Sequence, residues 1–149
     1  MLQLRRAGYR LAYRLLWLVA LVWAPRGQGA KAALVCRGEV LLVRHTYGPE
    51  RWELPGGGVH RGEDPLSGLR RELREELGLE IGEGDAVALE TLRGPGRLRH
   101  HRTHLFRVDI DQPRLRADPV EIAELLWCDP AAPPRPLGAN VRYALARVS

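Results

Sequence analysis

Residues 54–79, LPGGGVHRGEDPLSGLRRELREELGL, join a glycine run to a charged amphipathic segment, and this stretch decides the fold. Asp64-Pro65 is typical of a helix start, because an acidic N-cap precedes proline at the first helical position. Gly78 is typical of a helix stop, because glycine readily adopts the left-handed conformation that ends many helices. The pattern therefore predicts a helix that begins after Asp64 and runs to Leu77.

The predicted helix divides into three sectors when successive residues are placed about 100° apart. An apolar sector faces the core and comprises Leu66, Leu69, Leu73 and Leu77. A basic sector comprises Arg70, Arg71 and Arg74. An acidic sector adjoins the leucines and comprises Glu72, Glu75 and Glu76.

The acidic sector indicates a metal site more than a solvated face. A helix stabilised by surface ion pairs would place opposite charges four residues apart, and here only Arg71–Glu75 does so. Glu72 and Glu76 instead place like charges on neighbouring turns, which destabilises a helix unless a cation neutralises them. Because oxygen ligands favour Mg²⁺ or Mn²⁺ over zinc, we predict Glu72, Glu75 and Glu76 as ligands of such a cation.

Strand-like runs surround this segment. Residues 32–36 and 40–44 flank Arg37-Gly38 and predict a hairpin, and residues 52–55 predict a short strand that leads into the glycines. Further strands are expected at residues 86–92, 101–108 and 122–128, and a closing helix at 140–148. Strands mixed with two helices indicate an α/β or α+β fold with a mixed sheet.

The spacing Gly57-x₅-Glu63-x₇-Arg71-Glu72-Leu73-x-Glu75-Glu76-x-Gly78-Leu79 resembles, at every specified position, the Nudix box of the Nudix hydrolases. The segment at residues 54–58, which leads into the box, and the segment at 121–127 also resemble sequences of that family. The resemblance covers residues 31–148 and implies an α/β fold: a Nudix-type α/β/α sandwich with a mixed sheet.

The resemblance implies Mg²⁺-dependent hydrolysis of a nucleoside diphosphate linked to another moiety, with Mn²⁺ as a substitute. Cations must neutralise the pyrophosphate oxygens before water attacks phosphorus, and a carboxylate must accept the proton of that water. The catalytic candidates are Glu75, Glu76, Arg71 and Glu124, with Glu121 as a further candidate base. The substrate and phosphate-loop candidates are Gly57, Gly58, Glu63 and Arg44, and the two glycines are expected to permit backbone turns.

The sequence alone leaves several substrate classes as alternatives. Pro95 lies 16 residues past Leu79, a spacing that resembles the ADP-ribose-hydrolysing branch and favours ADP-ribose or a nucleotide sugar. The alternatives are a (deoxy)nucleoside triphosphate pyrophosphohydrolase and a Nudix-fold module that binds nucleotide without turnover. Such a module is expected to lose box carboxylates, and this chain keeps them. The histidine cluster His100, His101 and His104 lacks the acid or cysteine that would complete a transition-metal site.

The charge distribution argues against a nucleic-acid-binding domain. The chain has 149 residues, the length of one domain, and a formal net charge of +5. Residues 1–26 contain five arginines and no acid, so that residues 27–149 hold 18 basic and 18 acidic side chains. Nucleic-acid binding requires clustered excess positive charge, which this neutral body lacks. We therefore expect an N-terminal arm at 1–26, a Nudix hydrolase domain at 27–149 and a small-molecule nucleotide as partner, with a homodimer left open.

The N-terminal arm combines an apolar run with regularly spaced arginines. Residues 15–24 are ten consecutive apolar residues, half of what a membrane-spanning helix needs. Arginines at 6, 10 and 14 recur every four residues, which predicts a helical arm whose residues 1–24 contact an acidic membrane or a protein surface. A secretory signal and an exposed tail are the alternatives. Cys36 and Cys128 lie in apolar runs, which indicates buried thiols and a cytoplasmic protein, membrane-associated through the arm.

Overall fold

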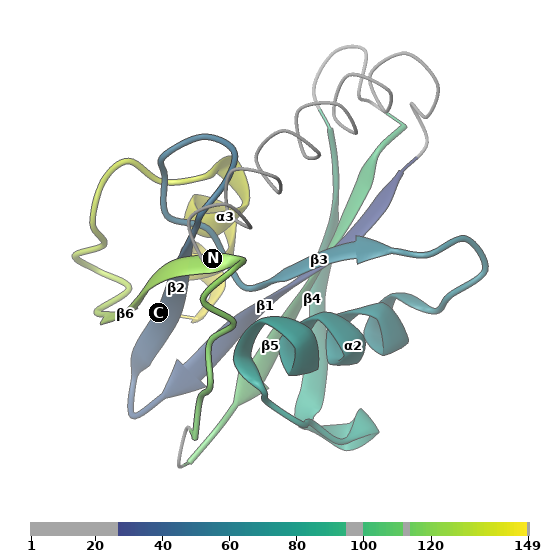
Figure 1. Cartoon of the computed structure of the whole chain (residues 1–149), viewed down its shortest axis with the longest axis horizontal. Coiled ribbons are helices and arrows are strands. Elements are labelled where there is room, and N and C mark those ends of the chain that lie inside the picture. The colour runs from purple at the N-terminus through teal and green to yellow at the C-terminus, as the bar shows by residue number, and fades with distance from the viewer. Residues whose placement is uncertain (1–26, 95–99, 112–113, 149) are drawn as a thin grey trace.

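The computed structural model describes residues 27–94, 100–111 and 114–148, and it shows a mixed α/β fold (Figure 1). The strands are β1 (Gln28–Cys36), β2 (Glu39–His45), β3 (Gly56–Val59), β4 (Ala86–Arg93), β5 (Arg102–Asp109) and β6 (Ile122–Cys128). The helices are α2 (Pro65–Leu77), α3 (Ala139–Val148) and the short 3-10 helix η1 (Glu83–Asp85). The predicted arm at residues 1–26 and the residue Pro95 lie outside the described residues.

The six strands form one mixed sheet, as the sequence predicts. The order along the sheet is β4-β5-β1-β2-β6, and β3 pairs with β1. Strand β1 runs parallel to β5 and antiparallel to its other partners. Its first half, residues 28–31, pairs with β3, whereas its last two residues pair with β2. The sheet therefore divides near the middle of β1, and this division lies beside the glycine run.

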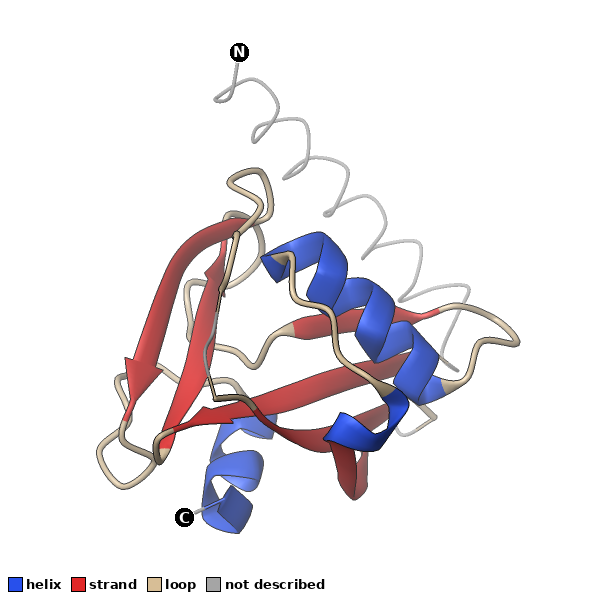
Figure 2. Ribbon diagram, turned by 90° about the horizontal axis from the view of Figure 1, so that it is seen from below, coloured by secondary structure: helices blue, strands red, loops and turns tan. Residues whose placement is uncertain are grey.

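Alternating side chains along the strands build a core on each side of the sheet. On one side, Leu41 and Val43 of β2 pack with the buried leucines of α2. On the other side, Val40 and Leu42 pack with Val141 and residues 144–145 of α3. Successive side chains of a strand point to opposite faces, which explains the separation. The helices α2 and α3 consequently cover opposite faces of the sheet, as Figure 2 shows.

Helix α2 begins and ends where the sequence predicts. The Asp64 carboxylate accepts hydrogen bonds from the backbone N–H groups of Leu66 and Ser67, at 3.0 and 3.1 Å, and so caps the N-terminus. Gly78 adopts φ 62°, and its N–H donates to the Arg74 carbonyl oxygen, which closes the C-terminus. These caps set the bounds of α2, and its buried leucines face the sheet.

The glycine run differs from the prediction. The expected strand at 52–55 is reduced to bridges that Trp52 and Glu53 make with other segments, and the regular strand is formed by the glycines themselves. The positive φ lies at Gly56 (113°), whereas Gly57 and Gly58 lie in β3 opposite β1. Pairing with a central strand overrides the weak strand preference of glycine. The expected backbone turn at Gly57 and Gly58 is therefore wrong.

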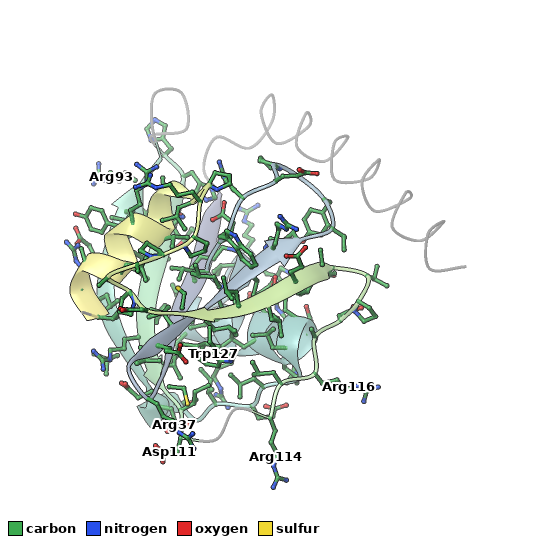
Figure 3. All side chains as sticks on the ribbon, turned by 90° about the vertical axis from the view of Figure 1, so that its left-hand side faces the viewer. Arg37, Arg93, Asp111, Arg114, Arg116 and Trp127 are labelled. Atoms are coloured by element: carbon green, nitrogen blue, oxygen red, sulfur yellow. The ribbon has the colours of Figure 1, made fainter. Side chains whose placement is uncertain are left out.

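The two cysteines of the chain are both buried. Cys36 and Cys128 are buried and carry free thiols, which confirms the predicted burial. Figure 3 shows Arg37, Asp111, Arg114 and Arg116 at one end of the molecule and Arg93 at the other. None of the helices that the structure describes has both the length and the apolar character that a membrane-spanning helix requires.

Candidate active site

Glu76 is the buried carboxylate around which the site is built. Its side chain is only 2% exposed and faces the start of β3, where its Oε2 accepts a hydrogen bond of 2.7 Å from the Gly56 N–H. Burial raises the pKa of Glu76 to about 7, against the opposing effects of Lys31 and of that hydrogen bond. A buried carboxylate with this raised pKa has a charge that the protein alone balances incompletely.

Glu72 lies one helical turn before Glu76 and explains why residue 57 is glycine. A Cβ placed on Gly57 would lie 2.4 Å from the Glu72 carboxylate. The glycine therefore lets this carboxylate approach the backbone of β3, and a larger residue would displace the carboxylate from this position. Gly58 has open space at the same position, so the structure gives no such reason for it.

Arg71 holds the acidic residues of the box in place. Its guanidinium donates to both carboxylate oxygens of Glu63 at 3.1 Å, to Glu72 at 2.7 Å and to the Gly58 carbonyl oxygen at 2.7 Å. These hydrogen bonds, together with one from the His60 N–H, lower the pKa of Glu63 to about 2. Bidentate guanidinium–carboxylate pairs fix geometry as well as charge. Arg71 and Glu63 therefore clamp the loop between β3 and α2 against the helix.

Glu75 lies apart from the two other candidate ligands on α2. Its side chain is 54% exposed, and its contact in the site is a 3.4 Å ion pair with Arg71. The structure thus brings Glu72 and Glu76 together beside the glycine strand and leaves Glu75 at the solvent edge. Both positions follow from the helical sector that the sequence defines, but the sector alone does not separate them.

Two residues from strands complete the buried part of the site, and the sequence interpretation missed both. Lys31 of β1 donates a short hydrogen bond to the Gly56 carbonyl oxygen. His45, at the end of β2, places Nδ1 3.9 Å from Oε1 of Glu76, and this Nδ1 is buried with no hydrogen-bond partner in the part of the chain that the structure describes. Burial and the nearby Lys31 charge lower the pKa of His45 to about 4, so the ring is neutral at pH 7.

Glu121 and Glu124 occupy different surroundings. The charge of Glu121 contributes to the raised pKa of Glu76, and its backbone carbonyl accepts from the Thr46 N–H at 2.8 Å. Glu124 instead forms a short ion pair with Arg44, its partner in the β2–β6 register. Arg44 lies on the same face of β2 as Leu42, and a register shift after Arg44 interrupts the alternation before His45.

The donor set fits a magnesium-like cation. Among residues 27–94, 100–111 and 114–148, no three acidic, histidine or cysteine side chains converge closely enough to form a complete protein site. Mg²⁺ commonly binds through one or two carboxylates, with waters and substrate phosphates as the other ligands. Glu72 and Glu76 supply two carboxylates at neighbouring turns, and the buried charge of Glu76 favours a cation beside it. Oxygen donors of this kind do not select zinc.

Comparison with known proteins identifies the family. The family model of the NUDIX domain matches residues 26–148. The chain belongs to the Nudix family. Nudix hydrolases generally use divalent cations, usually Mg²⁺, which agrees with the donors on α2. A solved Nudix structure, the MutT NUDIX hydrolase from Burkholderia pseudomallei, superposes with a TM-score of 0.73 at 27% identity and covers 83% of this chain and 98% of that one.

Curated Nudix relatives differ in the substrates that their names give. A putative 8-oxo-dGTP diphosphatase 2 from Mycobacterium tuberculosis is 45% identical over 83 residues, which are 50% of this chain and 59% of that protein. A CTP pyrophosphohydrolase from Escherichia coli is 36% identical over 103 residues, which are 66% of this chain and 73% of that protein. The match to the first of these relatives thus spans about three fifths of its length.

Proposed function

We propose that this Nudix protein is a Mg²⁺-dependent pyrophosphohydrolase that cleaves the phosphate anhydride of a nucleotide. The observation that carries the proposal is the buried Glu76 carboxylate beside Glu72 and the glycine strand, held by the Arg71 clamp. A buried carboxylate with incompletely balanced charge, beside a second carboxylate, is suited to a cation that is shared with phosphate. Family membership supports the same chemistry.

The residues of the chain have distinct tasks in this mechanism. Glu72 and Glu76 would hold the cation, which neutralises phosphate oxygens and lowers the pKa of the attacking water. Arg71 and Glu63 keep the β3–α2 loop and the Glu72 carboxylate oriented. Water adds to phosphorus while the bridging P–O bond breaks, and the leaving phosphate takes the electron pair. The proton of the water passes to a carboxylate, for which Glu75 and Glu121 are the candidates on the α2 side.

Glu124 is a weaker candidate for this base than Glu121. Its carboxylate is paired with Arg44, whereas the charge of Glu121 acts on Glu76. Arg44 also lies over the Trp52 ring, with its guanidinium carbon 5.5 Å from the ring centroid. A planar guanidinium on an aromatic ring can stack on a base or pair with phosphate, so we assign Arg44 to substrate binding.

We propose a nucleoside triphosphate as the substrate class. The names of the two relatives above, an 8-oxo-dGTP diphosphatase and a CTP pyrophosphohydrolase, support this choice. A nucleoside triphosphate would yield a nucleoside monophosphate and pyrophosphate. ADP-ribose or a nucleotide sugar is the second candidate, favoured by the spacing from Leu79 to Pro95. That substrate would yield a nucleoside monophosphate and a sugar phosphate, so the products separate the two classes.

The test is hydrolysis of a nucleotide panel with and without Mg²⁺, with product identification by chromatography. The panel contains canonical and 8-oxo nucleoside triphosphates, ADP-ribose and a nucleotide sugar. Glu76→Gln is expected to lower kcat about 10²–10³-fold, the usual cost of losing one electrostatic element of a phosphate site. Full turnover by this variant would refute the role of Glu76, and absence of hydrolysis across the panel by the parent would refute the enzyme proposal.

A further inference from the structure

The only lysine of the chain lies beside the site. The sequence contains 22 arginines and one lysine, Lys31. All the other members of the Lys and Arg set are arginines. Lys31 lies near the point where β1 changes its partner from β3 to β2. Arginine presents a broad planar fork, whereas lysine presents a compact point charge on a flexible stem. Lysine therefore places a compact charge on a flexible stem at this position.

Lys31 and Glu76 contact the same backbone residue. Gly56, which pairs with Lys31 in the β1–β3 register, accepts from the Lys31 ammonium through its carbonyl and donates to Glu76 through its N–H. Gly56 is itself fixed, because a Cβ there would lie 2.3 Å from the Ala30 carbonyl oxygen. The ammonium and the buried carboxylate are thus held on the two sides of one residue that admits no substitution.

The charge of Lys31 stabilises the Glu76 carboxylate, whereas the charges of Glu72 and Glu121 act in the opposite direction. His45, the remaining titratable neighbour, is neutral at pH 7. The ammonium therefore stabilises the Glu76 carboxylate and, by the same interaction, repels a divalent cation that would bind there. Binding of that cation neutralises the Glu76 charge that acts on the ammonium, and an anionic phosphate would supply a new counter-charge.

We propose that Lys31 is a phosphate-positioning residue that competes with the divalent cation for Glu76 in the free protein and pairs with a substrate phosphate once the cation is bound. This inference rests on the proposed function, since it assigns Lys31 to the same nucleotide site. The phosphate supplies the counter-charge that the ammonium loses when the cation binds, and it offsets the repulsion between the ammonium and the cation. Binding of the metal and binding of the phosphate therefore favour each other.

The test compares two affinities in the parent and in Lys31→Met, which keeps the apolar stem and removes the charge. Mn²⁺ alone, titrated by electron paramagnetic resonance, is expected to bind the variant about three- to tenfold more tightly, because one repulsive charge is gone. The Mg²⁺ complex of inorganic pyrophosphate, titrated calorimetrically, is expected to bind about tenfold more weakly. Lys31→Arg is expected to keep the Mn²⁺ affinity of the parent and part of the pyrophosphate affinity.

Arg74→Met is the matched control, because Arg74 lies on α2, is 57% exposed and loses the same charge. It is expected to leave both affinities unchanged, since solvent and salt screen an exposed charge. A Lys31 that only fastens Gly56 would give a different result, with Lys31→Met weakening both ligands. That result, or two unchanged affinities, would overturn the proposal.

A direct readout exists because the chain has one lysine. Protein labelled with ¹⁵N-lysine gives a single side-chain Nζ resonance, absent in Lys31→Arg, which is expected to shift when Mg²⁺–pyrophosphate saturates the site. An unmoved resonance in a parent that hydrolyses nucleotides would refute the role of Lys31 alone. A parent that neither hydrolyses the panel nor binds Mn²⁺ or Mg²⁺–pyrophosphate would refute the proposed function as well.

Discussion

Replacing Glu76 with Gln in metal-free buffer should make the stability of the protein depend on pH in a different way. Burial raises the pKa of Glu76 from 4.5 to about 7. The folded protein then binds this proton more tightly than the unfolded chain, so the free energy of unfolding falls as pH rises from 4.5 to 7. Gln does not titrate, and Glu76→Gln is expected to escape this loss.

The magnitude follows from the two pKa values. Each pH unit over which only the folded state holds the proton costs about 1.4 kcal/mol, so the full difference is at most about 3 kcal/mol. The variant and the parent should therefore be similar below pH 4.5, and the variant should be more stable by up to about 3 kcal/mol above pH 7. The Gln carbonyl can still accept from the Gly56 N–H, which keeps the backbone contact.

His45 contributes in the opposite direction. Burial, followed by the Lys31 charge, lowers its pKa to about 4, so stability present above pH 6.5 is lost as pH falls through 4. In the parent, the effects of Glu76 and His45 oppose each other between pH 4.5 and 6.5. In Glu76→Gln only the His45 effect remains, and the stability of the variant should rise steadily with pH across that range.

Urea unfolding from pH 4 to 8.5 with EDTA, followed by tryptophan fluorescence, measures these curves. Glu75→Gln is the control, because its exposed carboxylate should leave the curve of the parent unchanged apart from a few tenths of a kcal/mol. Added Mg²⁺ should stabilise the parent more than Glu76→Gln, because a ligand stabilises the state that binds it. Parallel curves for parent and Glu76→Gln would refute the burial of a titrating carboxylate at this position.

Three further predictions concern the clamp, the arm and the histidine cluster. Arg71→Gln should raise the pKa of Glu63 from about 2 toward 4.5, measured by NMR titration of its carboxyl carbon, and a pKa that stays near 2 would exclude Arg71 as the cause. Deleting residues 1–26 should leave Mg²⁺-dependent hydrolysis largely intact and reduce co-sedimentation with anionic vesicles; salt-insensitive, unchanged co-sedimentation would discard the membrane interpretation. Changing all three residues of the histidine cluster to Gln should leave the metal content unchanged by elemental analysis, and loss of stoichiometric zinc would contradict this.

Local signals in the sequence predict α2 and most strands closely, because they depend on nearby residues. Asp64 and Gly78 fix the bounds of α2, and the strand at Ile122–Cys128 follows its apolar run without displacement. Strand β3 could not be found in this way, because glycine has little strand preference and β1 imposes the pairing. Long-range pairing is not encoded in a single short segment.

The candidate site likewise combines features that local sequence predicts with features that depend on long-range packing. The helical sector places Glu72 and Glu76 beside the core, but only the packing of β3 shows that Glu76 is buried and Glu75 exposed. Lys31 and His45 are single polar residues in apolar strands, and no motif marks them. The one available signal for Lys31 was compositional, since it is the only lysine of the chain.

The pairing of β1 with β5 has a consequence for the order in which the protein folds. Residues 28–35 lie parallel to residues 102–109, so Lys31 reaches its place only after most of the chain has come together. Contacts between distant segments form slowly because their loops must close first, whereas a helix such as α2 forms on the microsecond scale. During refolding, helical circular dichroism should therefore recover before Mn²⁺ affinity, which makes metal binding a late marker of the finished native state.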